Sequence, residues 1–112
     1  MHKENKILLS GNRLISVSVP VYFFKYNGDG CIYAECPSLR ITTHGKTLSE
    51  AKKMFNEAFN LWLEVALEDG IREELKGLGW KVTPSEVRPK DEFRKIPLEI
   101  IASKLVHIPV AA

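Results

Sequence analysis

The stretch ISVSVPVYFFKYNGDGCIYAEC, residues 15–36, decides the fold of this chain. Its first half alternates apolar and polar side chains with a period of two, which is typical of a β-strand with one buried face. The glycine-rich residues 27–30 tolerate positive φ angles, and a second β-type run follows them immediately. The stretch therefore predicts a β-hairpin, with residues 13–26 as its first strand.

A third strand is expected after the hairpin. The chain breaks at Pro37-Ser38, residues 39–43 return to β-type side chains, and His44-Gly45 turns the chain again. Because Pro20 has no amide proton to donate, we expect the first strand to lie at an edge of the sheet or to be bulged there.

A long helix should begin at the capping box Thr47-Leu48-Ser49-Glu50, in which Thr47 accepts from the amide of Glu50 and Glu50 reaches back to the amide of Thr47. Apolar residues then recur at steps of three and four, and Gly70 is a good stop. This stripe consists of Leu48, Ala51, Phe55, Ala58, Trp62 and Val65, and Phe59, Leu63 and Leu67 widen it. Because the widened stripe exceeds what one sheet face covers, a second neighbour is expected for this helix.

The rest of the chain predicts short elements. Residues 71–78 form a shorter helix closed by Gly79, and Trp80-Lys81-Val82 begin a fourth strand. Residues 83–112 contain four prolines and are expected to be an extended arm. Two apolar runs in this arm suit pairing with a sheet edge in the same or another subunit, and the N-terminal run is expected to be an extension or a further strand. These three runs are Leu98–Ile101, Leu105–Ile108 and Lys6–Leu9.

Composition limits the classes of protein that fit the sequence. The 112 residues are enough for one domain with a core, and 16 basic against 14 acidic residues leave a net charge of only +2. That charge gives no bulk signature of nucleic-acid binding. No run approaches the roughly 18 apolar residues of a membrane helix, so we expect a cytoplasmic protein. Cys31 and Cys36 are expected on opposite faces of a strand, as separate free thiols.

The order of these features resembles the HicB antitoxin family over about residues 16–82. The resemblance is carried by the hairpin turn at 27–30, the break at Pro37-Ser38-Leu39, the GKTLSEA run at 45–51 and the LGWKV run at 78–82. It implies a partial ribonuclease-H-like layer of strand, strand, strand, helix, strand. We therefore divide the chain into an N-terminal extension or extra strand (1–15), a HicB-like domain (16–82) and an extended C-terminal arm (83–112) for oligomerisation or sheet extension.

The resemblance also implies a function. Members of the family bind a small HicA toxin, an mRNA-cleaving protein with a double-stranded-RNA-binding-like fold and a catalytic histidine, and block its active surface. Many members carry Pro-Gly-Cys where this chain has Leu39-Arg40-Ile41. Many also add a helix-turn-helix or ribbon-helix-helix segment that binds DNA, and residues 83–112 have the sequence pattern of neither. DNA binding therefore stays open. An orphan oligomeric binding module without a toxin and a residual nuclease are the alternatives.

The residues themselves favour binding over catalysis. Residues 13–26 contain no carboxylate, although two-metal nucleases of the implied fold need one on the first long strand. His2, His44 and His107 have no partner spaced to orient them, so we assign no catalytic, metal or cofactor site. Basic residues of the tail alternate with acidic ones, which keeps nucleic-acid contact as a minor alternative; they are Arg88, Lys90, Arg94, Lys95 and Lys104.

A protein interface is the expected functional surface. If the apolar face of the first strand packs on the helix, the aromatic residues between those positions lie on the opposite face, beside the second strand. An aromatic patch there favours a protein partner or self-association; the alternative is that an N- or C-terminal extension covers it within the monomer. The predicted interface residues are Tyr22, Phe24, Tyr26 and Tyr33 with Ile100, Val106 and Ile108 of the tail.

Overall fold

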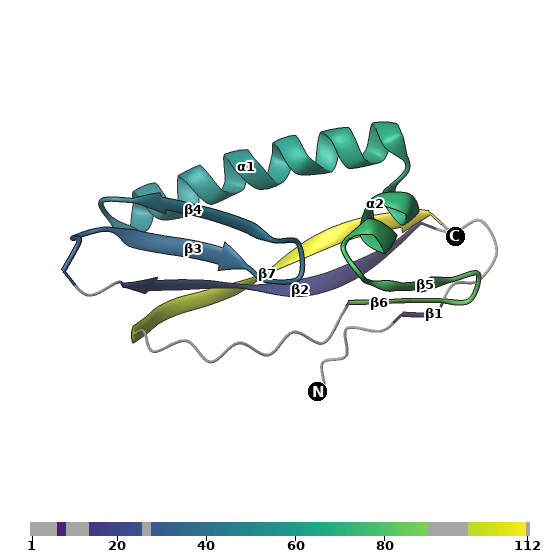
Figure 1. Cartoon of the computed structure of the whole chain (residues 1–112), viewed down its shortest axis with the longest axis horizontal. Coiled ribbons are helices and arrows are strands. Elements are labelled where there is room, and N and C mark those ends of the chain that lie inside the picture. Colours follow the sequence, from purple (N-terminus) through teal and green to yellow (C-terminus); the bar gives the residue numbers. More distant parts are fainter. Residues whose placement is uncertain (1–6, 9–13, 26–27, 90–98, 112) are drawn as a thin grey trace.

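A four-stranded antiparallel sheet with a long helix across one face forms the main layer of the molecule (Figure 1). The computed structural model describes residues 7–8, 14–25, 28–89 and 99–111. The strand order is β4-β3-β2-β7, which confirms the expected α+β class. The elements of this layer and the helix that follows it are β2 (Leu14–Lys25), β3 (Ile32–Cys36), β4 (Ile41–Gly45), α1 (Leu48–Asp69), α2 (Ile71–Gly77) and β7 (Glu99–Ala111).

The predicted hairpin joins β2 to β3. Tyr22 to Lys25 pair antiparallel with Ile32 to Glu35. In the loop between them, Gly28 and Gly30 have φ angles of 82° and 71°, a region that glycine enters without steric cost. The local sequence therefore determines both the turn and the register of this pair.

Helix α1 begins after Thr47 and ends before Gly70, as the sequence predicts. The Thr47 hydroxyl accepts from the Glu50 amide at 3.0 Å, as expected. The Glu50 carboxylate, however, accepts from the amide of Lys46 at 2.6 Å instead of the Thr47 amide, so the reciprocal bond of the box is shifted by one residue. Gly70, with a φ of 104°, follows the last helical residue and leads directly into α2.

Strand β7 takes one of the two roles expected for the tail, which is sheet extension. Residues 99–111 form one strand of 13 residues, which pairs antiparallel with β2 of the same chain along its whole length. The tail therefore extends the sheet within the chain, and β2 is an inner strand, contrary to the edge position expected from Pro20. Pro20 has no amide proton, and the inner position tolerates this because β3 pairs with β2 only from Tyr22 onward. At Pro20 the strand is paired with β7 and not with β3.

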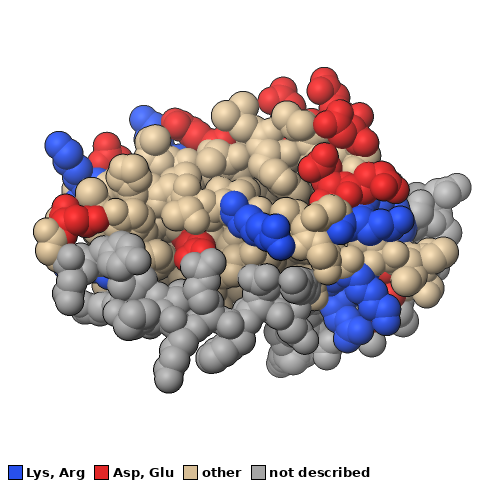
Figure 2. All heavy atoms as spheres, in the orientation of Figure 1, with Lys and Arg blue, Asp and Glu red and all other residues tan. Residues whose placement is uncertain are grey.

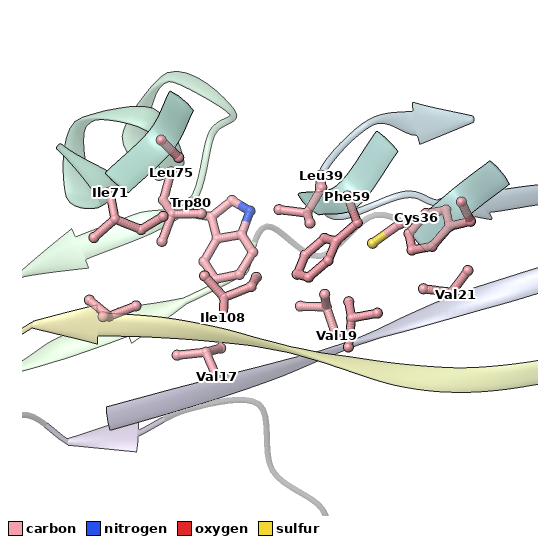
Figure 3. Packing of buried hydrophobic residues seen from close by; sticks show 14 of the residues in the cluster. Val17, Val19, Val21, Cys36, Leu39, Phe59, Ile71, Leu75, Trp80 and Ile108 are labelled. Atoms are coloured by element: carbon pink, nitrogen blue, oxygen red, sulfur yellow. The ribbon is translucent and has the colours of Figure 1, made fainter. Parts of the chain in front are cut away.

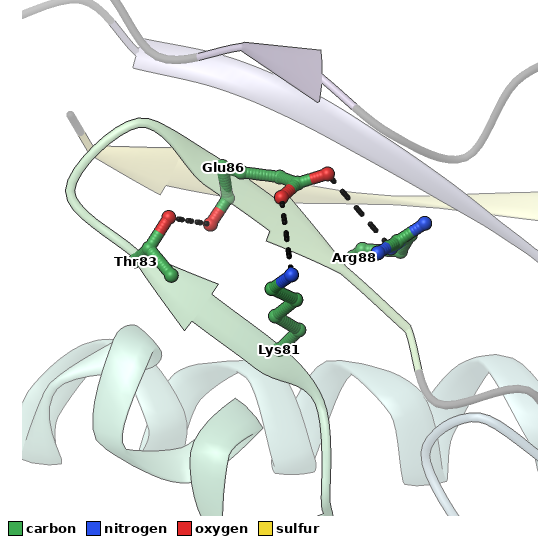
Figure 4. A network of polar contacts seen from close by, with 4 residues as sticks. All are labelled: Lys81, Thr83, Glu86 and Arg88. Atoms are coloured by element: carbon green, nitrogen blue, oxygen red, sulfur yellow. Dashed lines mark hydrogen bonds and ion pairs between the residues drawn. The ribbon is translucent and has the colours of Figure 1, made fainter.

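The fourth strand expected at residues 80–82 lies in a different sheet. It is β5 (Lys81–Thr83), which pairs with β6 (Glu86–Arg88), and β6 pairs in turn with β1 (Ile7–Leu8), part of the predicted N-terminal run. In this small sheet the Glu86 carboxylate lies between two cations (Figure 4). One of its oxygens is 3.9 Å from the Lys81 Nζ and the other is 3.8 Å from the Arg88 Nε. Pairs of this kind near the surface contribute little stability, so apolar packing must hold the small sheet in place.

The core lies between the main sheet, α1 and α2. The inward residues of β2, Val17, Val19 and Val21, face the helices together with Ile108 of β7 (Figure 3). Trp80 packs beside Ile71 and Leu75 of α2, and its indole nitrogen donates to the carbonyl of Ser38 at 2.9 Å. This indole joins α2 and the start of β5 to the main sheet.

Candidate protein interface

Two of the predicted aromatic residues, Phe24 and Tyr33, lie in a row across the sheet, on the face opposite α1. Phe24 of β2 is paired with Tyr33 of β3, which is paired with His44 of β4. The Phe24 and Tyr33 rings are stacked with centroids 5.7 Å apart, and the His44 ring lies 5.6 Å from Tyr33. Ile100 of β7 is paired with Phe24 and completes the row on the fourth strand. Among the described residues, the period of two thus correctly places Tyr22, Phe24 and Tyr33 on one face.

The row is less exposed than an open aromatic patch. Phe24 is only 4% exposed, and Tyr22 and Tyr33 are half-buried. Glu35, on the same face, is also buried. Only Ile100, at 52%, is broadly exposed among the predicted interface residues that the structure describes. Tyr26 lies outside the described residues.

Val106 and Ile108 do not belong to this face. Both are buried in the core, where β7 pairs them with Val19 and Val17. Their spacing from Ile100 predicts a shared face, but the register shifts between Phe23 and Phe24, where β7 carries one extra residue. Because one extra residue reverses the alternation of a strand, Ile100 faces away from α1 while Val106 and Ile108 face toward it.

A polar group lies at the hairpin end of the row. The Tyr33 hydroxyl donates to the Asp29 carboxylate at 2.5 Å, and the amide of Cys31 donates to the other carboxylate oxygen at 2.8 Å. These two bonds, with a smaller contribution from nearby His44, lower the pKa of Asp29 below its ordinary value. The loop carboxylate is therefore held in its charged form and fixes the Tyr33 ring against Phe24.

The Tyr33→Phe variant tests this bond. Loss of the hydroxyl should raise the pKa of Asp29 toward its ordinary value, because the Tyr33 bond is the largest cause of the shift. The lowered pKa of the folded state stabilises the wild type fully above about pH 4, and this contribution is lost as the pH falls through the lowered pKa. A carboxyl NMR titration of Asp29 measures the pKa, and unfolding at pH 6 and pH 2.5 measures the stability difference.

The control is Tyr22→Phe, which removes a hydroxyl from a half-buried tyrosine on the same face. It should leave the titration of Asp29 unchanged. An Asp29 titration that is the same in the Tyr33→Phe variant and in the wild type would contradict the assignment.

No reactive or metal-binding group stands out in the described part of the chain. Across residues 7–8, 14–25, 28–89 and 99–111, no three His, Cys, Asp or Glu side chains form a group suited to a metal ion. Cys31 and Cys36 are free thiols, and burial raises the pKa of Cys36 to about 11, so this thiol is protonated at neutral pH. His107 shares a 2.8 Å hydrogen bond with the Ser18 hydroxyl.

The basic residues of the tail lie apart from one another where the structure describes them. Arg88 is on the small sheet beside Glu86. The ammonium group of Lys104, on the helix side of β7, donates to the Asn56 side chain at 2.8 Å and lies over the Phe55 ring. Lys90, Arg94 and Lys95 lie outside the described residues. The two described cations therefore form no common basic patch.

The most exposed apolar side chains lie elsewhere, on α1. Met54, Leu61 and Val65 are 41%, 64% and 51% exposed. Sequence analysis placed Val65 and Leu67 in the apolar stripe, but both are exposed, and the buried positions of α1 are Ala51, Phe55, Phe59 and Ala66. Met54 and Leu61 were not part of that stripe, although they lie three or four residues from Ala58 and Val65. The width of the stripe nevertheless predicts a second neighbour for α1. Within the described residues, α2 is such a neighbour only at the C-terminal end of α1, so Met54, Leu61 and Val65 remain exposed.

Comparisons with protein-family models, with curated proteins and with solved structures found no match to this chain. No helix of the described residues is both long enough and apolar enough to cross a membrane. Function is therefore inferred from the residues of this chain and their arrangement.

Proposed function

We propose that this chain is a HicB-like antitoxin, which neutralises a HicA-like mRNA-cleaving toxin in the cytoplasm by binding it directly. The observation that carries the proposal is the order of elements in the main layer. β2, β3, β4 and α1 follow one another, and β7 closes the sheet beside β2. The first four elements agree with the strand, strand, strand, helix, strand series that the resemblance to the family implies. The last strand differs, because α2, β5 and β6 come between α1 and β7, and β7 takes the place first expected for residues 80–82.

The proposed mechanism is steric. A stable complex requires each partner to bury on the order of 800 Å², around a centre of apolar side chains. Among the described residues, the exposed large apolar side chains lie on α1 and along β7, and they provide such centres without any chemical step. Inhibition then follows from covering the surface with which the toxin contacts RNA.

The distribution of carboxylates also supports a binding role. Asp29 is engaged by Tyr33 in the hairpin loop, and Glu35 is buried in β3 on the face away from α1. Glu57, Glu64 and Glu68 are exposed on α1, on the other side of the sheet from Glu35. Two-metal hydrolysis requires carboxylates that converge within a few ångströms, and these carboxylates are distributed over both faces of the layer.

The test is neutralisation of the product of the adjacent small reading frame. Expression of that product alone should arrest growth and degrade mRNA, and co-expression of this chain should restore growth. The two proteins should also elute as one complex in size-exclusion chromatography. A neighbouring product that neither arrests growth nor binds this chain would overturn the proposal and favour an orphan binding module.

A further inference from the structure

The exposed flank of α1 has the pattern of a helix-docking surface. Met54, Ala58, Leu61 and Val65 follow one another at steps of four, three and four, which places them on one line along the helix. Ala58 is half-buried and the other three side chains are exposed, Leu61 to 64%. A line of this spacing is what a second helix requires for side-chain packing. We call these four residues the α1 stripe.

Carboxylates border the α1 stripe. Glu57 is three residues from Met54 and four from Leu61, Glu64 is three from Leu61, and Glu68 is three from Val65. All three are exposed, and within the described part of the chain none of them forms an ion pair. Figure 2 shows Asp and Glu gathered over the C-terminal end of α1 and over α2.

The end of α1 adds to this negative charge. Its last turn contains Glu68 and Asp69 and no basic residue. The C-terminus of a helix carries a partial negative charge, so carboxylates there are unfavourable and a cation is favourable. A partner that brings Lys or Arg to this end would therefore gain from the helix dipole as well as from the side chains.

The same charges argue against a second copy of this chain as the occupant. Two α1 stripes packed antiparallel would place Glu57 of each copy near Glu64 of the other. Like charges so placed are repulsive, and α1 itself contains only two lysines, Lys52 and Lys53, both near its N-terminal end. The complementary surface is an amphipathic helix with apolar residues in its centre and Lys or Arg along its border.

We infer that the α1 stripe and its glutamate border form the docking site for a basic amphipathic helix of a partner protein. This inference rests on the proposed function for the identity of that partner, because a protein that cleaves RNA needs cationic surface to approach phosphates. Docking at this site occupies part of that cationic surface, so Glu57, Glu64 and Glu68 take the place of RNA phosphates.

The experiment uses calorimetry to measure the affinity of this chain for the purified product of the adjacent reading frame. It is done at about 0.05 M salt, where charges are weakly screened, and at about 0.5 M salt, where they are strongly screened. Leu61→Ser should weaken binding at least about tenfold, as expected for a central apolar contact. Glu57→Gln/Glu64→Gln should weaken it about tenfold at low salt and much less at high salt.

Two matched controls are available on the same chain. Leu67 is exposed to a similar extent, 54%, but lies across the helix from the α1 stripe, so Leu67→Ser should bind like the wild type. Glu73→Gln/Glu74→Gln changes the net charge equally, but on α2 and away from the α1 stripe, so it should weaken binding at low salt much less than Glu57→Gln/Glu64→Gln does. Circular dichroism of each variant checks that the fold is retained.

The outcomes separate the two proposals. A wild-type chain that binds and rescues growth, while the α1 variants bind equally well, overturns the docking site and leaves the antitoxin function standing. A wild-type chain that binds no neighbouring product overturns both. An equal loss of affinity in the α1 variants and in their matched controls would also overturn the assignment of this face.

Discussion

The Ile108→Ala variant is expected to be less stable than the wild type by about 2–5 kcal/mol in its free energy of unfolding. Ile108 is fully buried, lies opposite Val17 in the register of β7 with β2, and packs in the core that contains Trp80. Truncation removes apolar contacts and leaves a cavity that the surrounding strands and helices fill only in part. Urea unfolding followed by tryptophan fluorescence and circular dichroism measures the loss.

Leu105→Ala on the same strand is the control. Its side chain is exposed on the face away from α1, so its truncation should cost less than about 1 kcal/mol. Because β7 pairs with β2 of its own chain, the loss in Ile108→Ala should not depend on protein concentration. A loss in Ile108→Ala that changes with protein concentration would contradict the pairing of β7 within its own chain.

Local signals account for the elements that the sequence predicts correctly. The period of two, the glycines at 28 and 30, the cap at Thr47 and the stop at Gly70 each act within a few residues, and each holds in the structure. Such signals depend on backbone conformation and on the nearest side chains, so they can be recognised without knowledge of the tertiary fold.

Strand partners depend on contacts far apart in sequence. Residues 81–83 and 99–111 both have β-type side chains, and nothing local indicates that the first joins the small sheet while the second completes the main one. The residues between α1 and these two segments include Trp80, which is buried in the core and donates to the carbonyl of Ser38, a contact 42 residues away in sequence. Pro20 likewise indicates only that β2 is unpaired on one side at that residue. It does not indicate that β2 is an edge strand.

The candidate interface was predictable only in part, for the same reason. Alternation places Tyr22, Phe24 and Tyr33 on one face, but alternation cannot show that Phe24 is buried there. The extra residue in β7 moves Val106 and Ile108 to the opposite face from Ile100, and a bulge of this kind has no marker in the sequence. On α1, the exposed α1 stripe follows from which residues the sheet and α2 cover, which depends on the packed fold.

Replacing Gly45 by alanine is expected to destabilise the chain by about 1–3 kcal/mol or more. A Cβ atom at this position would lie 2.7 Å from the backbone nitrogen of Ala51 and 2.9 Å from the carbonyl carbon of Glu50. These are main-chain atoms of the first turn of α1, so no rotation of a side chain relieves the contact. The end of β4 and the start of α1 would have to move apart. This is unfavourable because Ala51, in the first turn of α1, is fully buried.

Gly77→Ala is the matched control, because a Cβ atom there meets nothing within 4 Å. This exposed glycine ends α2, and alanine should leave stability unchanged or raise it by up to about 1 kcal/mol through the entropy of the unfolded chain. Parallel urea unfolding of both variants compares the same added methyl group in two environments. Equal stabilities would show that β4 and α1 can separate at little cost, and that the close approach does not require glycine at position 45. A selective loss in Gly45→Ala would show that the close approach of β4 to the first turn of α1 requires glycine.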